Sequence, residues 1–414
     1  MYINNRNHVF NRMENQSFAI FFSGIAPLST ADEQYPFEIN RNFYYLTGIE
    51  QEDVILVLFK GANQEKALLF IEPVDPVQAL WVGAGLTKEE AIQKSGITDI
   101  YDRKDYELVL SRYLQDSRAA IFGAIKYLYL DLERRDLRHM PTLANQCGQW
   151  MKDKYPNLVV ASIHPELGEL RSIKQPLEIQ AMAQAIEITK EGIEALFKAS
   201  KPGIKEHQLE AHYNFVLNQH GVKHSFGTIA ASGGNATILH YRKNNALIEK
   251  DSLILFDLGV QYDMYCSDIT RTFPVGGKFT DRQKAYYEIV LEANKRSIEF
   301  LKPGVTFKEW NDFGKKVLAE GLMKLGKIKD ESEVTKYYYH SLGHFLGLDV
   351  HDVGNYTKPF EVNQVLTVEP GLYIADEGIG IRIEDNVLIT KEGRVNLSKS
   401  IIKEVKDIEA FMKK

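Results

Sequence analysis

Two segments of the chain place acidic residues inside runs with the apolar texture of buried β-strands, and this combination constrains the fold most strongly. The first segment, residues 253–273, contains Asp257 and Asp268, which are equally distant from a polar turn around Tyr262 and Asp263. Residues equidistant from a hairpin turn lie opposite each other and point to the same face. Because strand interiors disfavour Asp and a buried carboxylate needs partners, the segment predicts a hairpin whose two carboxylates converge.

The second segment, residues 365–390, repeats this arrangement with Glu369 and Glu384 on either side of a turn at Asp376 and Glu377. Two such hairpins would bring four negative charges together, and such a cluster requires strong compensation. A solvated strand edge or a salt bridge explains any one of these carboxylates, but a symmetric set in apolar strands indicates a site. Divalent cations are the simplest compensation. Four carboxylates exceed the needs of one ion, so we expect two ions bridged by carboxylates.

A short internal repeat indicates that the two hairpins belong to similar halves of one domain. The tetrapeptides KPGI at 201–204 and KPGV at 302–305 each lie between segments with helical character. Each is followed by a histidine-bearing stretch, with His240 in the first half and His344 in the second, and then by an acidic hairpin. Chance can produce two similar tetrapeptides, but the matching order of the histidine stretches and hairpins favours a pseudo-symmetric domain with a site between its halves.

The second histidine stretch, HSLGHFLGLDVHD at 340–352, contains His340, His344 and His351. A helix would place the first two on one face, as in zinc-binding H-x-x-x-H pairs. However, no Glu follows the first histidine, and two glycines interrupt the run. Glycine is unfavourable inside a helix and common where backbone approaches another group closely, so we expect an extended or irregular stretch. Carboxylate oxygens with one imidazole indicate Mn²⁺, Co²⁺ or Mg²⁺ rather than a thiolate-rich zinc site.

The length of 414 residues exceeds one ordinary hydrophobic core, so two domains are expected. The first part alternates strand-like and helical segments, which is typical of an α/β domain. VILVLFKG at 54–61 and KALLFIEP at 66–73 are predicted to be neighbouring strands. An amphipathic helix with Pro176 near its first turn opens the second part. We therefore predict domains at 1–173 and 174–414.

Composition and charge exclude several classes of protein. The net charge of −6 and the pI near 6.1 argue against a protein that coats nucleic acid, and no apolar run approaches the length of a membrane span. Arg6 and Arg12 precede the apolar stretch 18–27 and imitate a signal peptide, but this run is short and a buried first strand is favoured. Cys147 and Cys266 are too few and too distant for a disulfide framework. We expect a cytoplasmic protein that binds neither nucleic acid nor membrane.

Together these motifs resemble those of the pita-bread metallopeptidases, and within that family those of aminopeptidase P, the Xaa-Pro aminopeptidases. The resemblance rests on Asp257 and Asp268 and on the runs SLGHFLGLDVHDVG, TVEPGLYI and GIRIEDN. The segment ADEQYPFEINRNFYYLTGIEQEDVILVL at 31–58 is similar to the aminopeptidase P amino-terminal domain. The resemblance implies an α/β amino-terminal domain followed by a pseudo-symmetric α+β pita-bread catalytic domain.

The resemblance also implies a dinuclear metal site with five protein ligands. Asp268 and Glu384 would bridge both ions, Asp257 would bind one ion, and His344 and Glu369 would bind the other. Manganese is the metal that the family favours, with cobalt or zinc as alternatives. A water or hydroxide that bridges the ions would be the nucleophile, and Glu369 is the candidate to take and relay its proton.

Five further residues are expected to act around this site. His240 would contact the substrate or stabilise the tetrahedral intermediate, and His351 would donate a hydrogen bond to the same developing charge. His340 would line the substrate pocket, and Tyr373 would form a hydrogen bond near the site. Arg382 lies two residues before the last ligand, so it shares that face of the strand and could orient a carboxylate or the substrate.

The predicted activity is removal of an amino-terminal residue that precedes proline, by a homodimer or homotetramer acting on peptides with proline at the second position. The nearest alternative is an Xaa-Pro dipeptidase, which shares the metal site and fold. A non-catalytic pita-bread binding module and a metal-free, creatinase-like hydrolase are disfavoured because all five ligands are present. Trp81 is either a core aromatic or a substrate contact across a subunit interface, and it is left unassigned.

Overall fold

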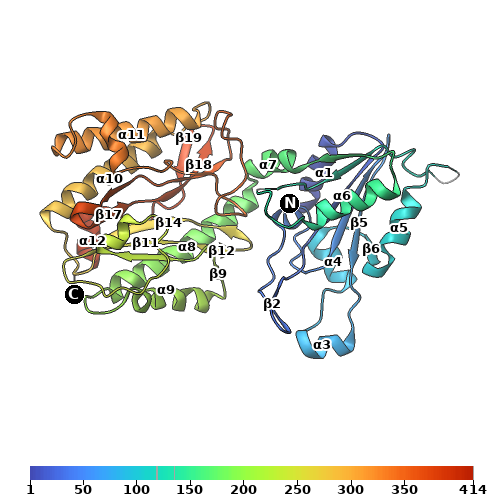
Figure 1. The fold of residues 1–414 in the computed structure, drawn as a ribbon, viewed down its shortest axis with the longest axis horizontal. Coiled ribbons are helices and arrows are strands. Elements are labelled where there is room, and N and C mark those ends of the chain that lie inside the picture. The colour runs from blue at the N-terminus through green and yellow to red at the C-terminus, as the bar shows by residue number, and fades with distance from the viewer. Residues whose placement is uncertain (118–119, 135, 414) are drawn as a thin grey trace. The chain divides into compact units, whose positions relative to one another are not determined.

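The computed structural model describes residues 1–117, 120–134 and 136–413 of the chain (Figure 1). The chain divides into two compact units, Met1–Leu170 and Arg171–Lys414. Residues 171–173, which the sequence assigns to the first domain, lie in the second unit. Within the described residues, no helix is both long enough and apolar enough to cross a membrane.

The first unit is built on a six-stranded sheet with the strand order β6-β5-β4-β1-β7-β8. Its strands are β1 (Ser17–Phe22), β4 (Ile55–Lys60), β5 (Glu65–Ile71), β6 (Asp99–Asp102), β7 (Tyr127–Leu130) and β8 (Val159–Ser162). The other elements are α1 (Tyr2–Arg12), the hairpin β2 (Leu28–Thr30) and β3 (Glu33–Gln34), α2 (Arg41–Thr47), α3 (Pro76–Val82), α4 (Lys88–Ser95), η1 (Arg103–Asp105), α5 (Tyr106–Tyr113) and α6 (Leu143–Lys154). The helix α7 (His164–Ser172) begins in this unit, and its last two residues belong to the second unit.

Two predictions for this unit are confirmed. The neighbouring strands expected at 54–61 and 66–73 are the antiparallel pair β4 and β5. The apolar stretch at 18–27 begins within β1, a buried strand that pairs with β4 on one side and with β7 on the other. The unit is therefore an α/β domain with its own hydrophobic core.

The second unit contains two helical pairs with strands between them (Figure 1). Its helices are α8 (Pro176–Ala199), α9 (Glu206–His220), α10 (Asp281–Phe300), α11 (Phe307–Lys324) and α12 (Val405–Phe411), with the short 3₁₀ helices η2 (Gly233–Thr237), η3 (Glu331–Lys336) and η4 (Ala375–Glu377). Its strands are β9 (Lys223–His224), β10 (Ile229–Ser232), β11 (Leu253–Leu258), β12 (Val260–Tyr262), β13 (Tyr265–Cys266), β14 (Ile269–Pro274), β15 (Val365–Val368), β16 (Gly371–Ile374), β17 (Ile379–Arg382), β18 (Asp385–Thr390) and β19 (Gly393–Asn396).

The predicted internal repeat has a structural counterpart in this unit. One KPG turn joins α8 to α9 and the other joins α10 to α11, and both turn glycines, Gly203 and Gly304, have positive φ angles of 82° and 89°. Such angles are accessible to glycine at no steric cost. Pro176 opens α8 at its first turn, and Thr280 caps α10 together with Gln283, as the sequence predicts. Each helical pair is followed by strands that end in an acidic hairpin.

The register of the first hairpin differs from the predicted one. Its turn lies at Asp263 and Met264, which have φ angles of 46° and 68°, one residue later than expected. Asp257 therefore pairs with Thr270, and Asp268 lies diagonally from it. A shift of this size moves the partner by two residues, so it preserves the face to which each side chain points. The prediction that Asp257 lies directly opposite Asp268 is wrong, but both carboxylates still lie on one face.

The register of the second hairpin is confirmed. Val368 pairs with Asp385 on one side of the acidic residues, and Gly371 pairs with Arg382 on the other side. Both pairings place Glu369 opposite Glu384, in the short break between the two ladders. The turn contains η4 and ends at Gly378 with a φ angle of 63°.

The substitution Gly192→Ala is expected to destabilise the second unit. A Cβ at this position of α8 would lie 2.3 Å from the buried ring of Tyr213 on α9. Alanine normally favours a helix over glycine by about 1 kcal/mol, but overpacking of a core costs about 1–3 kcal/mol. We expect the melting temperature to fall by about 2–4 °C for each kcal/mol lost. Thermal scans should show no such fall for the control Gln180→Ala on the exposed face of α8, and an unchanged Gly192→Ala protein would contradict the close contact.

Candidate metal centre

The stretch 340–352 is irregular, as its glycines predict, apart from an isolated bridge between Phe345 and Leu366. A Cβ on Gly343 would lie 2.1 Å from the carbonyl oxygen of Thr367, and one on Gly347 would lie 2.1 Å from a carboxylate oxygen of Asp352. Neither position has room for a side chain, and the glycine at 343 allows this stretch to pass close to β15. That close passage brings a histidine to the two acidic hairpins.

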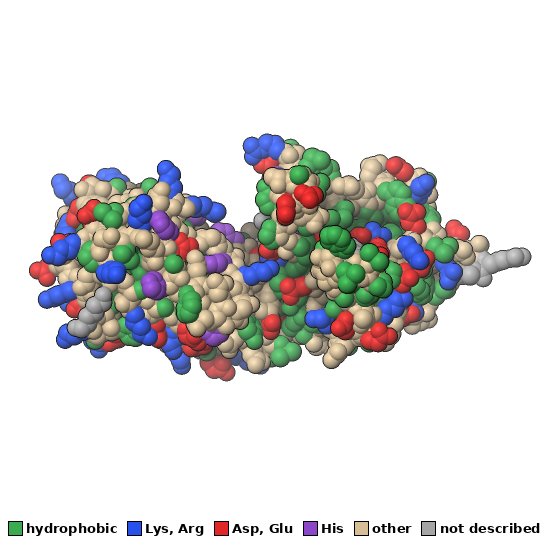
Figure 2. Space-filling view, turned by 90° about the horizontal axis from the view of Figure 1, so that it is seen from below, with side chains coloured by type: hydrophobic (Ala, Val, Ile, Leu, Met, Phe, Trp, Pro, Cys, Tyr) green, Lys and Arg blue, Asp and Glu red, His purple; other side chains and the backbone are tan. Residues whose placement is uncertain are grey.

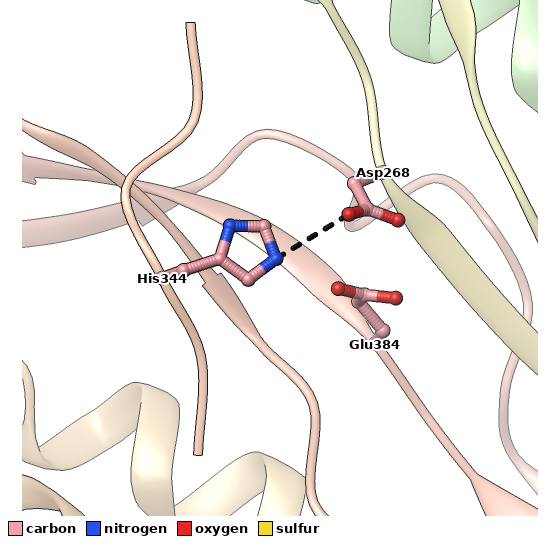
Figure 3. Close-up of side chains that lie close together, drawn as sticks. All are labelled: Asp268, His344 and Glu384. Carbon is pink, nitrogen blue, oxygen red and sulfur yellow. Dashed lines mark ion pairs between the residues drawn. The ribbon is translucent and has the colours of Figure 1, made fainter. Parts of the chain in front are cut away.

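Three side chains from distant parts of the chain converge in Figure 3: Asp268, His344 and Glu384. One potential ligand atom from each lies within 4.8 Å of the others. His344 Nε2 lies 3.5 Å from Asp268 Oδ2 and 3.7 Å from Glu369 Oε1. His344 Nδ1 lies 3.0 Å from the Phe345 carbonyl oxygen, so Nδ1 donates a hydrogen there and the Nε2 lone pair faces the carboxylates. This is the tautomer that binds a metal through Nε2.

Two carboxylate oxygens in this cluster are buried without a hydrogen-bond partner among the described residues. They are Asp257 Oδ1 and Asp268 Oδ1. The other oxygen of Asp257, Oδ2, accepts a hydrogen bond of 2.5 Å from Arg382 Nη2. A buried polar atom without a partner is unfavourable and requires an explanation, and oxygen atoms of this kind fit a divalent cation. The donor set of carboxylates and one imidazole therefore fits the metal site that the sequence predicts.

Burial raises the pKa of several of these carboxyl groups, because it disfavours their charged forms. For Asp268, burial and then the neighbouring charges of Asp257 and Glu369 hold the pKa well above its ordinary value. The pKa of Glu384 is also well above its ordinary value, first through burial and then through Asp268 and Glu369. Burial raises the pKa of Glu369 as well, although the neighbouring His344 and Arg382 oppose this effect. The cluster thus holds protons readily, and a cation would compete with them.

Hydrogen bonds from neighbouring strands orient the ligand candidates. Thr270 Oγ1 donates to Glu384 Oε2 at 2.7 Å and accepts from Arg382 Nε at 3.1 Å. The side-chain amide of Asn386 donates to the Asp268 carbonyl at 2.6 Å and accepts from the Asp268 N–H at 3.2 Å. A side chain of one hairpin therefore continues the main-chain hydrogen bonding of the other. This joins the two hairpins at the residues that carry the carboxylates.

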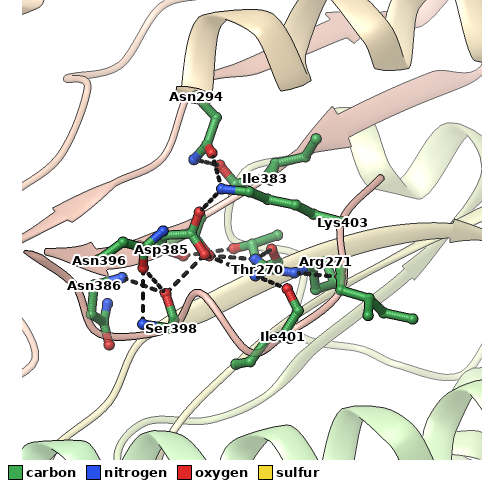
Figure 4. Close-up of polar contacts among 12 residues, drawn as sticks. Thr270, Arg271, Asn294, Ile383, Asp385, Asn386, Asn396, Ser398, Ile401 and Lys403 are labelled. Atoms are coloured by element: carbon green, nitrogen blue, oxygen red, sulfur yellow. Dashed lines mark hydrogen bonds and ion pairs between the residues drawn. The ribbon is translucent and has the colours of Figure 1, made fainter. Parts of the chain in front are cut away.

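A buried polar network lies beneath the second hairpin (Figure 4). Asn294 of α10 donates from Nδ2 to the carbonyls of Val368 and Ile383, at 3.0 and 3.1 Å. These are the residues immediately before Glu369 and Glu384. One side-chain amide therefore binds both strands where the β15–β18 ladder gives way to the β16–β17 ladder. Sequence reasoning missed Asn294, because its partners are main-chain carbonyls that no sequence pattern marks.

The same network contains a fully buried ion pair. Arg271 of β14 donates to Asp385 at 2.8 Å and to the Glu384 carbonyl at 2.5 Å (Figure 4). Lys403 also forms an ion pair with Asp385, and Ser398 donates to it at 2.8 Å. The two cations hold the pKa of Asp385 far below its ordinary value despite its burial. The pair was not predicted, although Arg271 and Asp385 each lie in an apolar run of the sequence, and this is a signal that could have indicated it.

The remaining predicted residues lie around the carboxylates. Tyr373 accepts a hydrogen bond of 3.0 Å from Arg382 Nη1, and its hydroxyl lies 2.8 Å from His340 Nε2. Burial, followed by the charge of Arg382, lowers the pKa of His340 to about 3, so this ring is neutral. The ring of His351 packs edge-on against that of His344, with centroids 4.2 Å apart. His240 is close enough for its charge to lower the pKa of both His340 and His351.

Two side chains noted in the sequence lie elsewhere. Cys266 is buried, and its Sγ lies 3.6 Å from the Leu348 carbonyl, so it packs against the histidine stretch. Trp81 lies on α3 and is 85% exposed, so its interpretation as a core aromatic is wrong.

Comparison with known proteins places both parts of the chain in families. Residues 180–391 match the model of metallopeptidase family M24, and residues 2–122 match the aminopeptidase P N-terminal domain. The chain is 36% identical to the Xaa-Pro aminopeptidase of Haemophilus influenzae and 34% identical to that of Escherichia coli, over 98% of this chain and 96% of each relative. A candidate aminopeptidase P from Bacillus anthracis superposes with a TM-score of 0.96 at 44% identity, and zinc-substituted E. coli aminopeptidase P in complex with product superposes with 0.89 at 32%. Both structural alignments cover 99% of this chain and 97% of the other.

The fold and the acidic site therefore define a metallopeptidase, and the chain belongs to metallopeptidase family M24. Within that family it is a metallo-exopeptidase of the aminopeptidase P group, with the amino-terminal domain and the pita-bread domain that the resemblance implies. Membership of this family implies bound divalent metal ions.

The stabilisation that a divalent metal gives this protein is expected to grow with pH. Raised carboxyl pKa values mean that the metal-free folded form retains protons which the unfolded chain loses above about pH 4. The metal-free form therefore loses stability as pH rises, whereas the cation binds the deprotonated groups. Melting temperatures with Mn²⁺ and with a chelator, measured between about pH 5.5 and 8, should diverge as pH rises. A difference that is constant or shrinks would contradict the proton–metal competition.

Proposed function

We propose that this chain removes the amino-terminal residue that precedes proline in peptides, using two divalent metal ions held between its acidic hairpins. The proposal rests on the convergence of Asp268, His344 and Glu384, whose potential ligand atoms lie within 4.8 Å of one another. Glu369 Oε1 lies 3.7 Å from His344, and Asp257 is close enough for its charge to raise the pKa of Asp268. Two carboxylate oxygens of this group lack hydrogen-bond partners among the described residues. Peptides with proline at the second position are the substrates that the relatives' names indicate. Residues 1–173 and 174–414 would form the amino-terminal and catalytic domains.

In this proposal, Asp268 and Glu384 would be shared between the ions. Asp257 would hold one ion, and His344 and Glu369 would hold the other. Manganese is the favoured metal, with cobalt or zinc as alternatives, because oxygen-rich ligation with one imidazole suits such ions. The shared positions agree with the burial of Asp268 and Glu384, which are 4% and 1% exposed and have the strongly raised pKa values.

The protein's own residues then manage charge and protons. When bound, the two cations would polarise the peptide carbonyl and lower the pKa of the attacking water. Glu369 would accept the proton of that water, since its raised pKa makes it a stronger base than an ordinary carboxylate. Arg382 would hold Asp257 in place through its 2.5 Å hydrogen bond. His240 and His351 would donate hydrogen bonds to the charge that develops on the carbonyl oxygen.

Both ring nitrogens of His340 are held by hydrogen bonds, and these contacts define its role in the pocket. Its Nδ1 lies 2.7 Å from the Ser341 carbonyl oxygen, so this nitrogen carries the hydrogen. Its Nε2 therefore accepts a hydrogen bond from Tyr373, whose oxygen receives one from Arg382. Because both ring nitrogens are engaged, we assign His340 to the wall of the substrate pocket, with Tyr373 as the group that fixes its ring.

The assembly and location of the protein are part of the proposal. Apolar side chains are exposed on the first unit (green in Figure 2), and on α3 Leu80, Trp81 and Val82 are 86%, 85% and 76% exposed. Contiguous exposed apolar residues are typical of protein contacts, which supports a homodimer or homotetramer. The free cysteines Cys147 and Cys266 are buried, in keeping with a reducing, cytoplasmic compartment.

A paired substrate assay tests the activity and separates it from a dipeptidase. With Mn²⁺ present, the purified protein is expected to cleave Xaa-Pro-Yaa peptides between Xaa and Pro faster than Xaa-Pro dipeptides. Activity should be lost after chelation and restored by Mn²⁺. Cleavage of the dipeptide alone would show an Xaa-Pro dipeptidase, and a protein inactive on both peptides would contradict the enzyme assignment.

The substitution Glu369→Gln is expected to lower kcat by about 100-fold or more, because it removes both a ligand and the proton acceptor. Loss of the acceptor should also remove the acidic limb of the pH–rate profile. The matched control is Glu361→Gln, an exposed position in the turn before β15, which should retain wild-type kinetics. Glu369→Gln protein that keeps wild-type kcat would exclude Glu369 from the chemistry.

A further inference from the structure

A second buried carboxylate, Glu206, lies outside the metal centre at the first position of α9. Its side chain is 0% exposed, and its two oxygens accept five hydrogen bonds. Oε1 accepts from the Ser232 N–H at 2.8 Å, from the Ser232 hydroxyl at 2.7 Å and from Asn235 Nδ2 at 3.2 Å. Oε2 accepts from the Tyr241 hydroxyl and from the Ala246 N–H, both at 2.9 Å.

All of these donors belong to one segment, residues 232–246, which carries His240. Ser232 begins the segment, Ala246 ends it, and Tyr241 directly follows the histidine. A single carboxylate therefore ties both ends and the middle of this segment to α9. A buried carboxylate is tolerated only when it is well hydrogen-bonded, and the amino-terminal end of a helix favours an anion. The five hydrogen bonds therefore hold segment 232–246 rigidly against the start of α9.

The other side of the same segment contacts elements of the metal centre. A Cβ on Gly380 of β17 would lie 2.1 Å from the Ala236 carbonyl oxygen, so the segment packs tightly on the strand that ends at Arg382. The Tyr339 hydroxyl donates to the Thr237 carbonyl at 3.2 Å, next to His340. The segment is thus held between Glu206 on one side and the site on the other.

We propose that Glu206 is a positioning residue that acts through His240, by fixing segment 232–246 so that this histidine is presented to the substrate. The proposal rests on the role assigned to His240 above and adds the group that sets its place. Glu206 contacts neither the ligand candidates nor the pocket residues in any of its five hydrogen bonds. Its loss should therefore affect catalysis without affecting the metal content.

The test is a double-mutant cycle of Glu206→Gln and His240→Ala, measured as kcat and KM with an Xaa-Pro-Yaa peptide. Glutamine keeps the size of the side chain, but either orientation of its amide turns an NH₂ group toward a main-chain N–H, of Ser232 or of Ala246. We expect Glu206→Gln to lower kcat/KM by about 10- to 100-fold. His240→Ala should lower it by about 100-fold or more. In the His240→Ala background, Glu206→Gln should cost less than about twofold.

Metal content and a matched control separate positioning from damage to the fold. Glu206→Gln should bind the same amount of Mn²⁺ per chain as the wild type. The control is Glu178→Gln on α8, a carboxylate that is 1% exposed and accepts hydrogen bonds from the Gln175 N–H at 2.8 Å and from the Tyr265 hydroxyl at 2.9 Å. Glu178→Gln should lose the same factor in kcat/KM, however small, in both His240 backgrounds, because its hydrogen bonds lie outside segment 232–246.

The outcomes distinguish the positioning role of Glu206 from the role of His240 in catalysis. An equal loss from Glu206→Gln in both backgrounds, or a loss of bound metal, overturns the proposal while leaving the role of His240 intact. Full activity of His240→Ala shows instead that the role of His240 is wrong, and the proposal for Glu206 falls with it. If Glu206→Gln does not fold, Tyr241→Phe replaces it, because it removes the Tyr241 hydrogen bond to Glu206 and leaves the carboxylate. Its smaller loss should also disappear in the His240→Ala background, and an equal loss in both would overturn the proposal.

Discussion

The repulsion among four clustered carboxylates, of which Asp268 and Glu384 are buried, is the constraint on which the second unit depends. Asp257, Asp268, Glu369 and Glu384 could not remain charged together in an apolar interior without strong positive compensation. Arg382 supplies part of this compensation through Asp257. The rest is left to protons or to cations, and the two carboxylate oxygens without partners among the described residues mark where cations would bind. The cations that would carry out the chemistry would therefore also neutralise the carboxylates of the core.

Such a cluster also demands rigid support, because carboxylates that could move apart would relieve their repulsion without a metal. The hairpins are fixed at the ligand positions themselves. Asn386 pairs with the main chain of Asp268, and Asn294 binds the carbonyls that precede both glutamates. The buried pair of Arg271 and Asp385 anchors the strand behind Glu384. A preformed arrangement of this kind lowers the cost of orienting ligands when cations bind.

Much of this centre could be predicted from the sequence, because the signal was local. Acidic residues in apolar strands showed which side chains would converge, and the symmetric spacing of Glu369 and Glu384 gave their register. The first hairpin was misplaced by one residue, since its turn uses Asp263 and Met264 rather than an Asn-Gly pair that would mark positive φ angles. The supporting roles of Asn294 and Glu206 could not be predicted. Their partners are brought together only by tertiary folding.

The most direct test of the dinuclear metal site is a crystal structure of the Mn²⁺-loaded protein, with anomalous diffraction used to locate the metal. A dinuclear site requires two anomalous peaks, both contacted by Asp268 and Glu384, one contacted by Asp257 and the other by His344 and Glu369. A single peak, or a peak bound by His240, His340 or His351 in place of these ligands, would contradict the dinuclear carboxylate-bridged site.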